Sequence, residues 1–436
     1  MKKIALISLG CEKNLVDSEM ILGLLKKSDI EIVNSMEDAD IIIINTCGFI
    51  ASAKEEAINT IFDALDFKKD GKKIIVCGCL VERYLDELKK EIKEVDEWIP
   101  IKDYYRFGDI IKQYLRDDSL ALEYLKMDSR LISTPAHLAY VRIADGCLHR
   151  CSYCAIPLIR GNLKSRGEDE IVAEVLEYAK EGRTEICLIS QDTSAYGYDI
   201  HTNLTSLLKK LIKIDGIKWF RLLYLYPSEI KDDLIKLIKE NDKIIPYFDI
   251  PLQHASDKIL KYMKRIGDLA SIKALLTKIK KEIPSAILRT TMMVGFPHES
   301  EKDFNILLDF IKEFKFNHLG AFTYSKEEDT ASFLMSGQVS EKVKKERLNI
   351  LMDKQRWISF SLNKEMIGKT YDCIIEKYDE EEDKFYGRTY AFAPDDIDGM
   401  VIIDNNHKYD NNIISSFKKI EIIDADFYDL KAKWLE

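Results

Sequence analysis

Three cysteines in one short loop constrain this chain more than any other feature of its sequence. They have the spacing C-x3-C-x2-C and follow an apolar segment that we expect to be a strand; they are Cys147, Cys151 and Cys154. Three thiolates so close in sequence can all reach one small metal centre. A structural zinc site normally has four protein ligands, so zinc would need a distant fourth ligand such as His149 or Cys187. A four-iron, four-sulfur cluster on three cysteines instead leaves one iron without a protein ligand, and that iron can bind a small molecule.

The composition is that of a folded protein with two or three domains. The chain has 436 residues, of which 46% are apolar and 32% charged. No apolar run approaches the length that spans a bilayer. The first residues resemble a lipoprotein signal ending at Cys11, but the apolar part is short and a helical pattern follows at once, so we expect a buried strand. Nine cysteines without a signal sequence predict a cytoplasmic, reducing environment, where cysteines bind metal more often than they form disulfides.

The first region, residues 1–131, alternates strands and helices. The expected strands are short, apolar and rich in β-branched residues, and they lie at 3–9, 40–45 and 72–77. The expected helices lie at 17–27, 51–67 and 82–91. Continuous apolar strands are typical of a parallel sheet that is covered on both faces. The alternation therefore predicts a doubly wound α/β domain.

Each of these strands ends at a cysteine that has a glycine beside it. The cysteines are Cys11, Cys47 and Cys79. Ligands of parallel α/β sheets bind beyond the carboxyl ends of the strands, so the three should converge in one crevice, and glycine lets the backbone approach a bulky centre. This arrangement predicts a second iron–sulfur cluster, and the alternative is three buried structural cysteines. We choose Cys79 over Cys77 as the third ligand because Cys77 still belongs to the strand, whereas Cys79 begins the loop.

The central region, residues 136–335, predicts an open, partial barrel of six β/α units. Its strand candidates lie at 140–145, 185–190, 219–226, 247–251, 287–294 and 318–324, with amphipathic helices between most of them. A closed eightfold barrel takes about 250 residues, which is more than this region offers. Polar or special residues come just after the strands: the cysteine loop, Gln191-Asp192, Pro227-Ser228, Gln253-His254, Gly295-Phe296-Pro297 and Ser325. Such loops build the active site of a barrel, so we expect the site on this face.

The last region begins with a connecting helix at 340–363 and continues as a small antiparallel β barrel at 364–436. From 364 onward the chain has 10 lysines and arginines against 18 aspartates and glutamates, a net charge of −8 out of −10 for the whole chain. A nucleic-acid-binding surface should be basic, so we expect this barrel to meet a basic protein instead. Asp395, Asp396 and Asp398 are acids that we expect to face such a partner.

The order of these three regions resembles the methylthiotransferases of the radical S-adenosylmethionine (SAM) superfamily. The cysteine loop is similar to the superfamily's cluster motif, and the likeness covers nearly the whole chain. Some motifs are similar to the branch that modifies the β-carbon of an aspartate in small-subunit ribosomal protein twelve. They are Ser8–Glu19, with Glu12 where proline is expected; Ile189–Gly197; Pro251–Ser256; and, in the terminal TRAM barrel, Gly387–Pro394. The segment Gly295–Ser300 departs from the family at His298.

The resemblance implies a radical mechanism with two four-iron, four-sulfur clusters and SAM. The cluster on the C-x3-C-x2-C loop would reduce SAM with an electron from an external donor, and the resulting 5′-deoxyadenosyl radical would take a hydrogen from the aspartate. The cluster on Cys11, Cys47 and Cys79 would hold the sulfur, which a second SAM methylates. The expected SAM contacts are Tyr153, Gln191, Gln253, Arg289 and Gly295.

Two alternatives stay open at this point. Within the same family the substrate could be tRNA, as in the branch that modifies an isopentenyladenosine-type base. In a different class, the chain could be a non-catalytic electron carrier or a zinc-binding module. Electron carriers usually hold their clusters with four cysteines, so two sets of three favour an enzyme.

Overall fold

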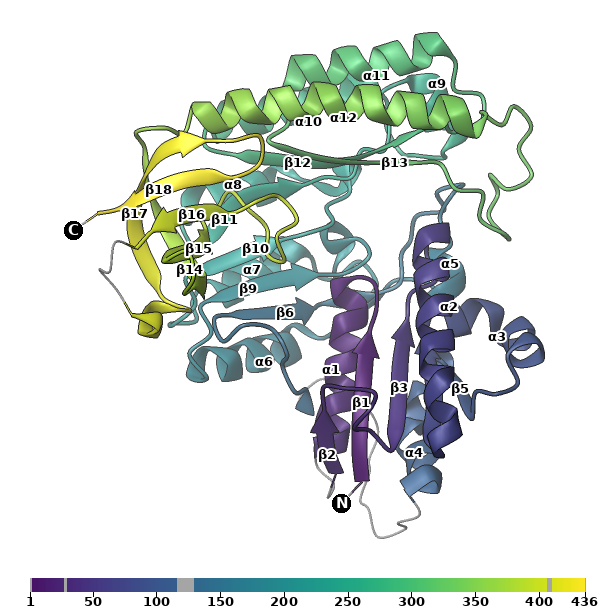
Figure 1. The fold of residues 1–436 in the computed structure, drawn as a ribbon. Coiled ribbons are helices and arrows are strands. Elements are labelled where there is room, and N and C mark those ends of the chain that lie inside the picture. Colours follow the sequence, from purple (N-terminus) through teal and green to yellow (C-terminus); the bar gives the residue numbers. More distant parts are fainter. Residues whose placement is uncertain (1, 27–29, 116–128, 406–409, 436) are drawn as a thin grey trace.

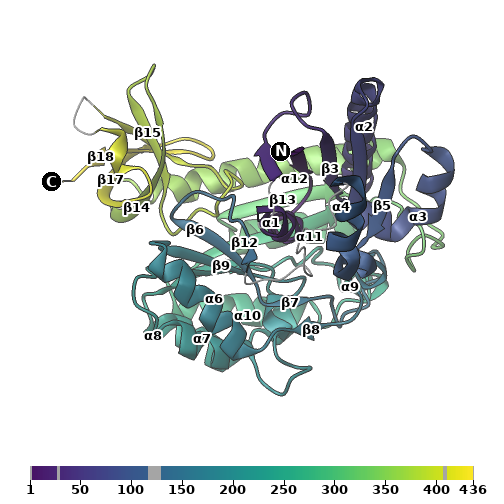
Figure 2. The ribbon, with the colours of Figure 1, turned by 90° about the horizontal axis from the view of Figure 1, so that it is seen from below.

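The computed structural model describes residues 2–26, 30–115, 129–405 and 410–435, and it contains three regions, each with a sheet of its own (Figure 1). The N-terminal region and the C-terminal barrel lie well apart, and both pack against the central region (Figure 2). Within the described ranges, no helix has the length and apolarity that crossing a membrane requires.

The N-terminal region is a five-stranded, all-parallel sheet in the order β2-β1-β3-β4-β5. Its strands are β1 (Lys2–Ser8), β2 (Ile30–Val33), β3 (Ile41–Thr46), β4 (Lys73–Gly78) and β5 (Glu97–Pro100). One face is covered by α1 (Glu12–Lys26) and α4 (Phe107–Leu115), and the other by α2 (Ala51–Asp66) and α3 (Cys79–Glu91). The predicted doubly wound domain is confirmed, and the short edge strands β2 and β5 are additions to the prediction.

Two helices of this region begin earlier than the sequence pattern predicted. Helix α1 begins at Glu12, directly after Cys11, and α3 begins at Cys79 itself. The expectation that Cys79 begins a loop is therefore wrong. Gly78 makes the abrupt change from strand to helix possible, because its φ of 102° lies in a region that favours glycine.

The central region is an open sheet of six parallel strands in the order β13-β12-β11-β10-β9-β6 (Figure 1). The strands are β6 (Leu138–Arg142), β9 (Glu185–Ile189), β10 (Trp219–Leu222), β11 (Ile244–Asp249), β12 (Ile287–Val294) and β13 (His318–Thr323). The helices on its outer face are α6 (Glu168–Lys180), α7 (Leu204–Leu211), α8 (Asp232–Glu240), α10 (Leu269–Glu282) and α11 (Glu301–Phe314). The predicted partial barrel is confirmed, with β6 and β13 as its free edges.

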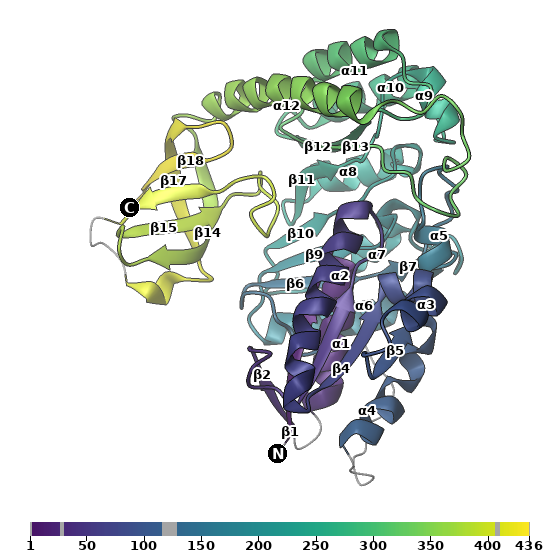
Figure 3. The ribbon, with the colours of Figure 1, turned by 45° about the vertical axis from the view of Figure 1, so that its right-hand side comes forward.

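Helix α12 (Glu341–Lys364) connects the central region to the C-terminal barrel (Figure 3). Its Leu351 is fully buried, and Leu348, Met352 and Ile358 pack against the same core. The barrel is closed in the order β14-β15-β16-β18-β17. Its strands are β14 (Thr370–Asp379), β15 (Lys384–Arg388), β16 (Val401–Asp404), β17 (Phe417–Ala425) and β18 (Leu430–Trp434). Four neighbouring pairs are antiparallel as expected, but β16 and β18 pair in parallel.

The C-terminal barrel is joined to the amino ends of the central strands by buried charges. Glu185, the first residue of β9, accepts hydrogen bonds from Arg388 (2.8 Å) and Arg221 (2.9 Å), and all three side chains are fully buried. Asp398 is only 6% exposed and accepts hydrogen bonds from Arg289 (3.2 Å) and from the Tyr247 hydroxyl (2.5 Å).

These contacts correct the expectation that Asp398 faces a partner, because its carboxylate is used inside the molecule. Asp395 accepts a hydrogen bond from Tyr140 but is exposed, and Asp396 is exposed too. For these two acids the expectation stays a prediction. The sequence count of charges could not distinguish acids at a domain junction from acids on the surface.

The N-terminal region contacts the central region near both free edges of the open sheet. At the β6 edge, α1 contributes Asp17, which pairs with Arg142. Beyond the β13 edge, Glu327 pairs with Lys54 of α2 (2.8 Å) and with Arg83 of α3 (3.0 Å). The N-terminal region therefore spans the carboxyl side of the partial barrel.

Candidate functional site

The three N-terminal cysteines converge at the carboxyl ends of neighbouring strands. Cys11 follows β1, Cys47 follows β3 and Cys79 follows β4. Two glycines allow the close approach. A Cβ on Gly10 would lie 2.7 Å from the Cys47 Cβ, and a Cβ on Gly48 would lie 2.7 Å from the Leu80 Cα, next to Cys79. The predicted role of glycine is thus visible as contact between the loops that carry the cysteines.

Cys77 and Cys79 lie in different surroundings, although only one residue separates them. Cys77 is fully buried in the core beneath α1 and α4, and its burial raises its pKa to about 12. Cys79 is partly exposed and lies within reach of Asn14 and Arg160. This difference supports Cys79 as the ligand.

The N-terminal thiols need a cation to ionise together. Burial, together with the smaller effect of the neighbouring sulfurs of Cys79 and Cys11, raises the pKa of Cys47 to about 11. Thiolates that repel one another in a poorly solvated site are stabilised by a bound metal. The three donors therefore fit an iron-containing centre.

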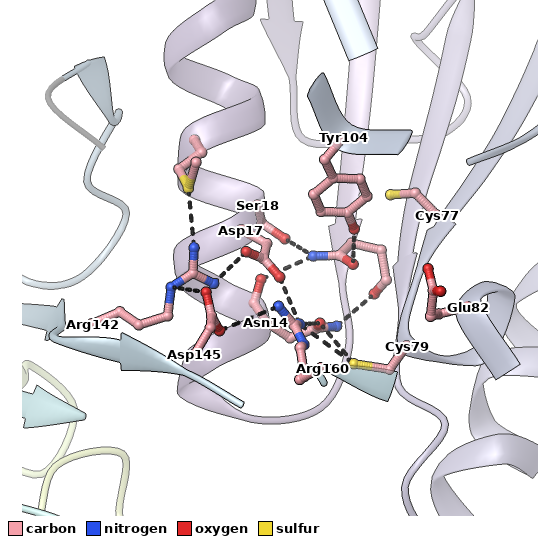
Figure 4. Close-up of polar contacts among 12 residues, drawn as sticks. Asn14, Asp17, Ser18, Cys77, Cys79, Glu82, Tyr104, Arg142, Asp145 and Arg160 are labelled. Carbon is pink, nitrogen blue, oxygen red and sulfur yellow. Dashed lines mark hydrogen bonds and ion pairs between the residues drawn. The ribbon is translucent and has the colours of Figure 1, made fainter. Parts of the chain in front are cut away.

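A polar network that the sequence analysis missed surrounds Cys79 (Figure 4). Asn14 donates from its amide nitrogen to the Leu9 and Thr46 carbonyl oxygens at 2.7 and 3.1 Å, and so ties the ends of β1 and β3 together. Arg160 comes from the central region and donates to Asp17 Oδ2 at 2.7 Å. Asn14 and Asp17 lie within the Ser8–Glu19 motif, three and six residues after Cys11. On a helix that begins after Cys11, this spacing was the sequence signal that they lie near the site.

The second set of cysteines lies in the loop between β7 (Ala144–Asp145) and α5 (Ile156–Ile159). Burial raises the pKa of Cys147 to about 11 and that of Cys154 to about 12. The loop is fixed at Ser152, whose backbone N–H donates to Met263 O at 2.9 Å and whose hydroxyl donates to Tyr262 O at 2.8 Å. A partly exposed loop with three mutually repelling sulfurs again fits a metal centre.

The geometry does not favour a single zinc ion. Across the described ranges, no three cysteine, histidine or carboxylate side chains are grouped closely enough for one ion. Both residues considered as a fourth zinc ligand are engaged or buried elsewhere. His149 Nε2 lies 2.9 Å from Asp192 Oδ2 and its ring stacks on Tyr226 at 3.6 Å, while Cys187 is fully buried in β9. Neither residue is therefore in place as a fourth zinc ligand.

Two of the expected SAM contacts carry acceptors that no donor among the described residues uses. Gln191 follows β9 and Gln253 follows β11, and the side-chain oxygen of each is buried without a hydrogen-bond partner there. Gln253 also has a φ of 72°, which is uncommon outside glycine, so its backbone is strained. Buried acceptors at the carboxyl end of a barrel are available to a ligand's N–H and O–H groups. The residues present therefore fit SAM.

Tyr153 and Gly295 lie on the same side of the barrel, in more ordinary surroundings. Tyr153 packs edge-on against Phe296 with ring centroids 6.4 Å apart, and burial raises its pKa. The Gly295 N–H donates to Glu299 at 2.8 Å, and a Cβ on Gly295 would meet Lys344 of α12 at 2.2 Å. The packing of α12 against this position therefore explains the glycine without a ligand.

Arg289 does not stand where a SAM contact was expected. Its guanidinium pairs with Asp249 at 2.9 Å and with Asp398 of the C-terminal barrel at 3.2 Å. It is the third residue of β12 and so lies near the amino end of that strand, whereas the cysteine loop lies at the carboxyl end of the sheet. Its charge is therefore used at the domain junction, and we do not retain it as a SAM contact.

Comparison with known families divides the chain in the same way as its sheets. Residues 3–100 match "Uncharacterized protein family UPF0004", residues 141–311 match the radical SAM superfamily and residues 367–435 match the TRAM domain.

Relatives cover nearly the whole chain. A protein of Acetivibrio thermocellus named "Ribosomal protein uS12 methylthiotransferase RimO" is 43% identical, over 98% of this chain and 97% of its own length. A protein of Aquifex aeolicus with the same name is 45% identical, over 97% and 96%. Among solved structures, the radical SAM methyltransferase TsrM from Kitasatospora setae, with cobalamin and a [4Fe-4S] cluster bound, has a TM-score of 0.55 at 11% identity, covering 76% of this chain and 77% of TsrM. That likeness concerns the fold alone.

Proposed function

Because this chain belongs to the RimO family of ribosomal protein uS12 methylthiotransferases, we propose that it attaches a methylthio group to the β-carbon of an aspartate in uS12. The observation that carries the proposal is the pair of three-cysteine sets, one at the strand ends of the N-terminal sheet and one in the loop after β7. They are linked because Arg160, six residues after Cys154, hydrogen-bonds the Cys79 sulfur at 3.4 Å.

We propose that Cys147, Cys151 and Cys154 hold one four-iron, four-sulfur cluster and that Cys11, Cys47 and Cys79 hold a second. When bound, the first cluster supplies the electron for reductive cleavage of SAM, and the second supplies the sulfur. An external donor must deliver that electron.

The protein's own residues position and shield the reactants. The side-chain oxygens of Gln191 and Gln253 accept hydrogen bonds from SAM, and Tyr153 packs beside it. The N-terminal region, held at Glu327 and at Asp17, covers the carboxyl side of the barrel and excludes water. We assign residues 1–131 to the N-terminal methylthiotransferase domain, 136–335 to the radical SAM core and 364–436 to the TRAM domain.

The acidic turn between β14 and β15 is our proposed contact for the basic substrate protein. Glu380, Glu381 and Glu382 are exposed there, unlike Asp398. Opposite charge accelerates association and is screened by salt. Reversing Glu380 and Glu381 to lysine should weaken binding of uS12 several-fold at low salt. The same reversal at the exposed Asp232 and Asp233 of α8 is the control and should have little effect.

The test of the function is mass spectrometry of uS12 from cells that lack this protein. We expect the aspartate-bearing peptide to lose the mass of a methylthio group, and a plasmid copy to restore it. Nucleosides of tRNA from the same cells are the second measurement. An unchanged uS12 together with a missing methylthio nucleoside would transfer this chain to the tRNA branch. Since uS12 joins the ribosome in the cytoplasm, we assign the reaction to that compartment.

A further inference from the structure

Arg160 is a buried cation that reaches from the central region into the N-terminal cysteine site (Figure 4). Its side chain is 4% exposed. One nitrogen, Nη2, lies 3.4 Å from Cys79 Sγ, 2.7 Å from Asp17 Oδ2 and 3.2 Å from Asn14 Oδ1. The other terminal nitrogen lies 3.8 Å from Asp145.

The chain between Cys154 and Arg160 is short and ordered by its own hydrogen bonds. It consists of Ala155 and helix α5, and the Arg160 N–H closes the helix by donating to Ile156 O at 2.8 Å. Ala155 and Ile159 are buried. The position of the guanidinium is thus set by the same segment that carries the last cysteine of the other site.

The guanidinium is also fixed from the N-terminal side. Asp17 receives Arg160 on one carboxylate oxygen and Arg142 on the other. Arg142 in turn pairs with Asp145 at 3.3 Å. Arg142 therefore holds the carboxylate that holds Arg160, and Arg160 is the arginine that donates to the Cys79 sulfur.

The donors at three other cysteines are backbone N–H groups. Cys47 has the backbone N–H groups of Gly48 and Phe49, Cys147 has that of His149, and Cys154 has that of Ile156. At Cys79 the donor is a charged side chain from another domain.

We propose that Arg160 is a positioning residue for the N-terminal cluster, holding the Cys79 sulfur in place and raising the cluster's reduction potential. The inference rests on the second cluster of the proposed function. Reduction adds an electron to the cluster, and a cation that hydrogen-bonds a ligand sulfur stabilises the reduced state. Because the cation comes from the radical SAM core, the potential of the N-terminal cluster depends on docking of the two domains.

The experiment is a redox titration followed by electron paramagnetic resonance. The protein is the full chain with Cys147, Cys151 and Cys154 replaced by alanine, reconstituted without oxygen, so that only the N-terminal cluster contributes. Arg160→Gln should lower the midpoint potential. Arg160→Lys, which keeps the charge but loses the planar fork, should lie between Arg160→Gln and the parent. Arg142→Lys, which acts on Asp17 and reaches Arg160 only through it, is the matched control and should shift the potential less than Arg160→Gln does.

Release of iron to a chelator is the second measurement, in case a variant holds its cluster weakly. Faster release from Arg160→Gln than from Arg142→Lys, with recovery in Arg160→Lys, would support the proposal. A parent potential in Arg160→Gln, or an equal shift in Arg142→Lys, would overturn it. A parent protein that takes up no iron, while its far-ultraviolet circular dichroism is that of the folded chain, would overturn the second cluster itself.

Discussion

The central barrel is closed at its two ends by different domains, both through buried arginine–carboxylate contacts. At the amino end, Glu185 and Asp398 are paired with arginines, and their pairs join the C-terminal barrel to the core. At the carboxyl end, Gln191 and Gln253 keep buried acceptors with no partner among the described residues, and the cysteine loop follows β7. Buried polar groups at the amino end are paired with one another and stabilise the fold. Buried polar groups at the carboxyl end include some that are left to bind a ligand.

The largest expected effect lies at the carboxyl end. Replacing Cys147, Cys151 and Cys154 together with alanine should remove about half of the iron and abolish SAM cleavage, because the iron that binds SAM is lost. Replacing Cys11, Cys47 and Cys79 should also remove about half, but should keep SAM cleavage and stop methylthiolation. Iron analysis and a 5′-deoxyadenosine assay check both. Cys187→Ala and Cys373→Ala are the controls, and loss of half the iron in either would contradict the ligand assignment.

At the amino end the expected loss is in stability rather than in chemistry. Glu185→Gln leaves Arg388 and Arg221 buried without their shared carboxylate, which should cost about 3–5 kcal/mol of unfolding free energy. Denaturant unfolding measures the cost. Glu421→Gln, which breaks an exposed pair with Lys433, should cost less than about 1 kcal/mol. Equal iron per folded molecule in wild type and Glu185→Gln would support a role of the amino end in stability alone. A loss of iron from the folded variant would contradict that role.

Acid should weaken the amino-end junction through the same glutamate. Burial raises the pKa of Glu185, but the charges of Arg388 and Arg221 outweigh it. Together they lower the pKa from its ordinary value of 4.5 to about 2. A depressed pKa means that the stabilisation is complete above about pH 4.5 and is lost as the pH falls toward 2. Because acid also releases metal, the measurement uses iron-free protein. The stability difference between wild type and Glu185→Gln should shrink over this range, and a constant difference would refute the assignment.

The smallest expected effect tests how the carboxyl-end site is assembled. Gly10→Ala places a methyl group 2.7 Å from the Cys47 Cβ at a φ of 93°, and should cost about 1–3 kcal/mol and weaken iron binding at the N-terminal site. Gly71→Ala is the matched control, since its φ of 79° is similar but nothing lies within 4 Å. Iron content and thermal unfolding of both variants check this. Equal iron content in the two variants would show that the close approach of Gly10 to Cys47 does not affect iron binding.

What the sequence predicted well is encoded over short distances. The cysteine loop and the three N-terminal strand ends follow from local patterns, and they lie where those patterns place them. The junctions were not predictable, because Arg388 and Glu185 are 203 residues apart and Arg160 and Cys79 are 81 apart. Arg289 was misjudged for the same reason: a basic residue on a barrel strand gives no sign of which end its partner comes from. The edge strands β2 and β5 have four residues each, which is too short to stand out by periodicity.

The segment from Cys154 to Arg160 sets the spacing between the two cysteine sets. A helix turns by about 100° and advances about 1.5 Å with each residue, so one inserted or deleted residue in α5 would swing Arg160 away from Cys79 while leaving every side chain chemically intact. Chain length is therefore a constraint of its own here, separate from residue identity. Relatives that keep both cysteine sets are expected to keep this spacing, even where the apolar residues of α5 have changed.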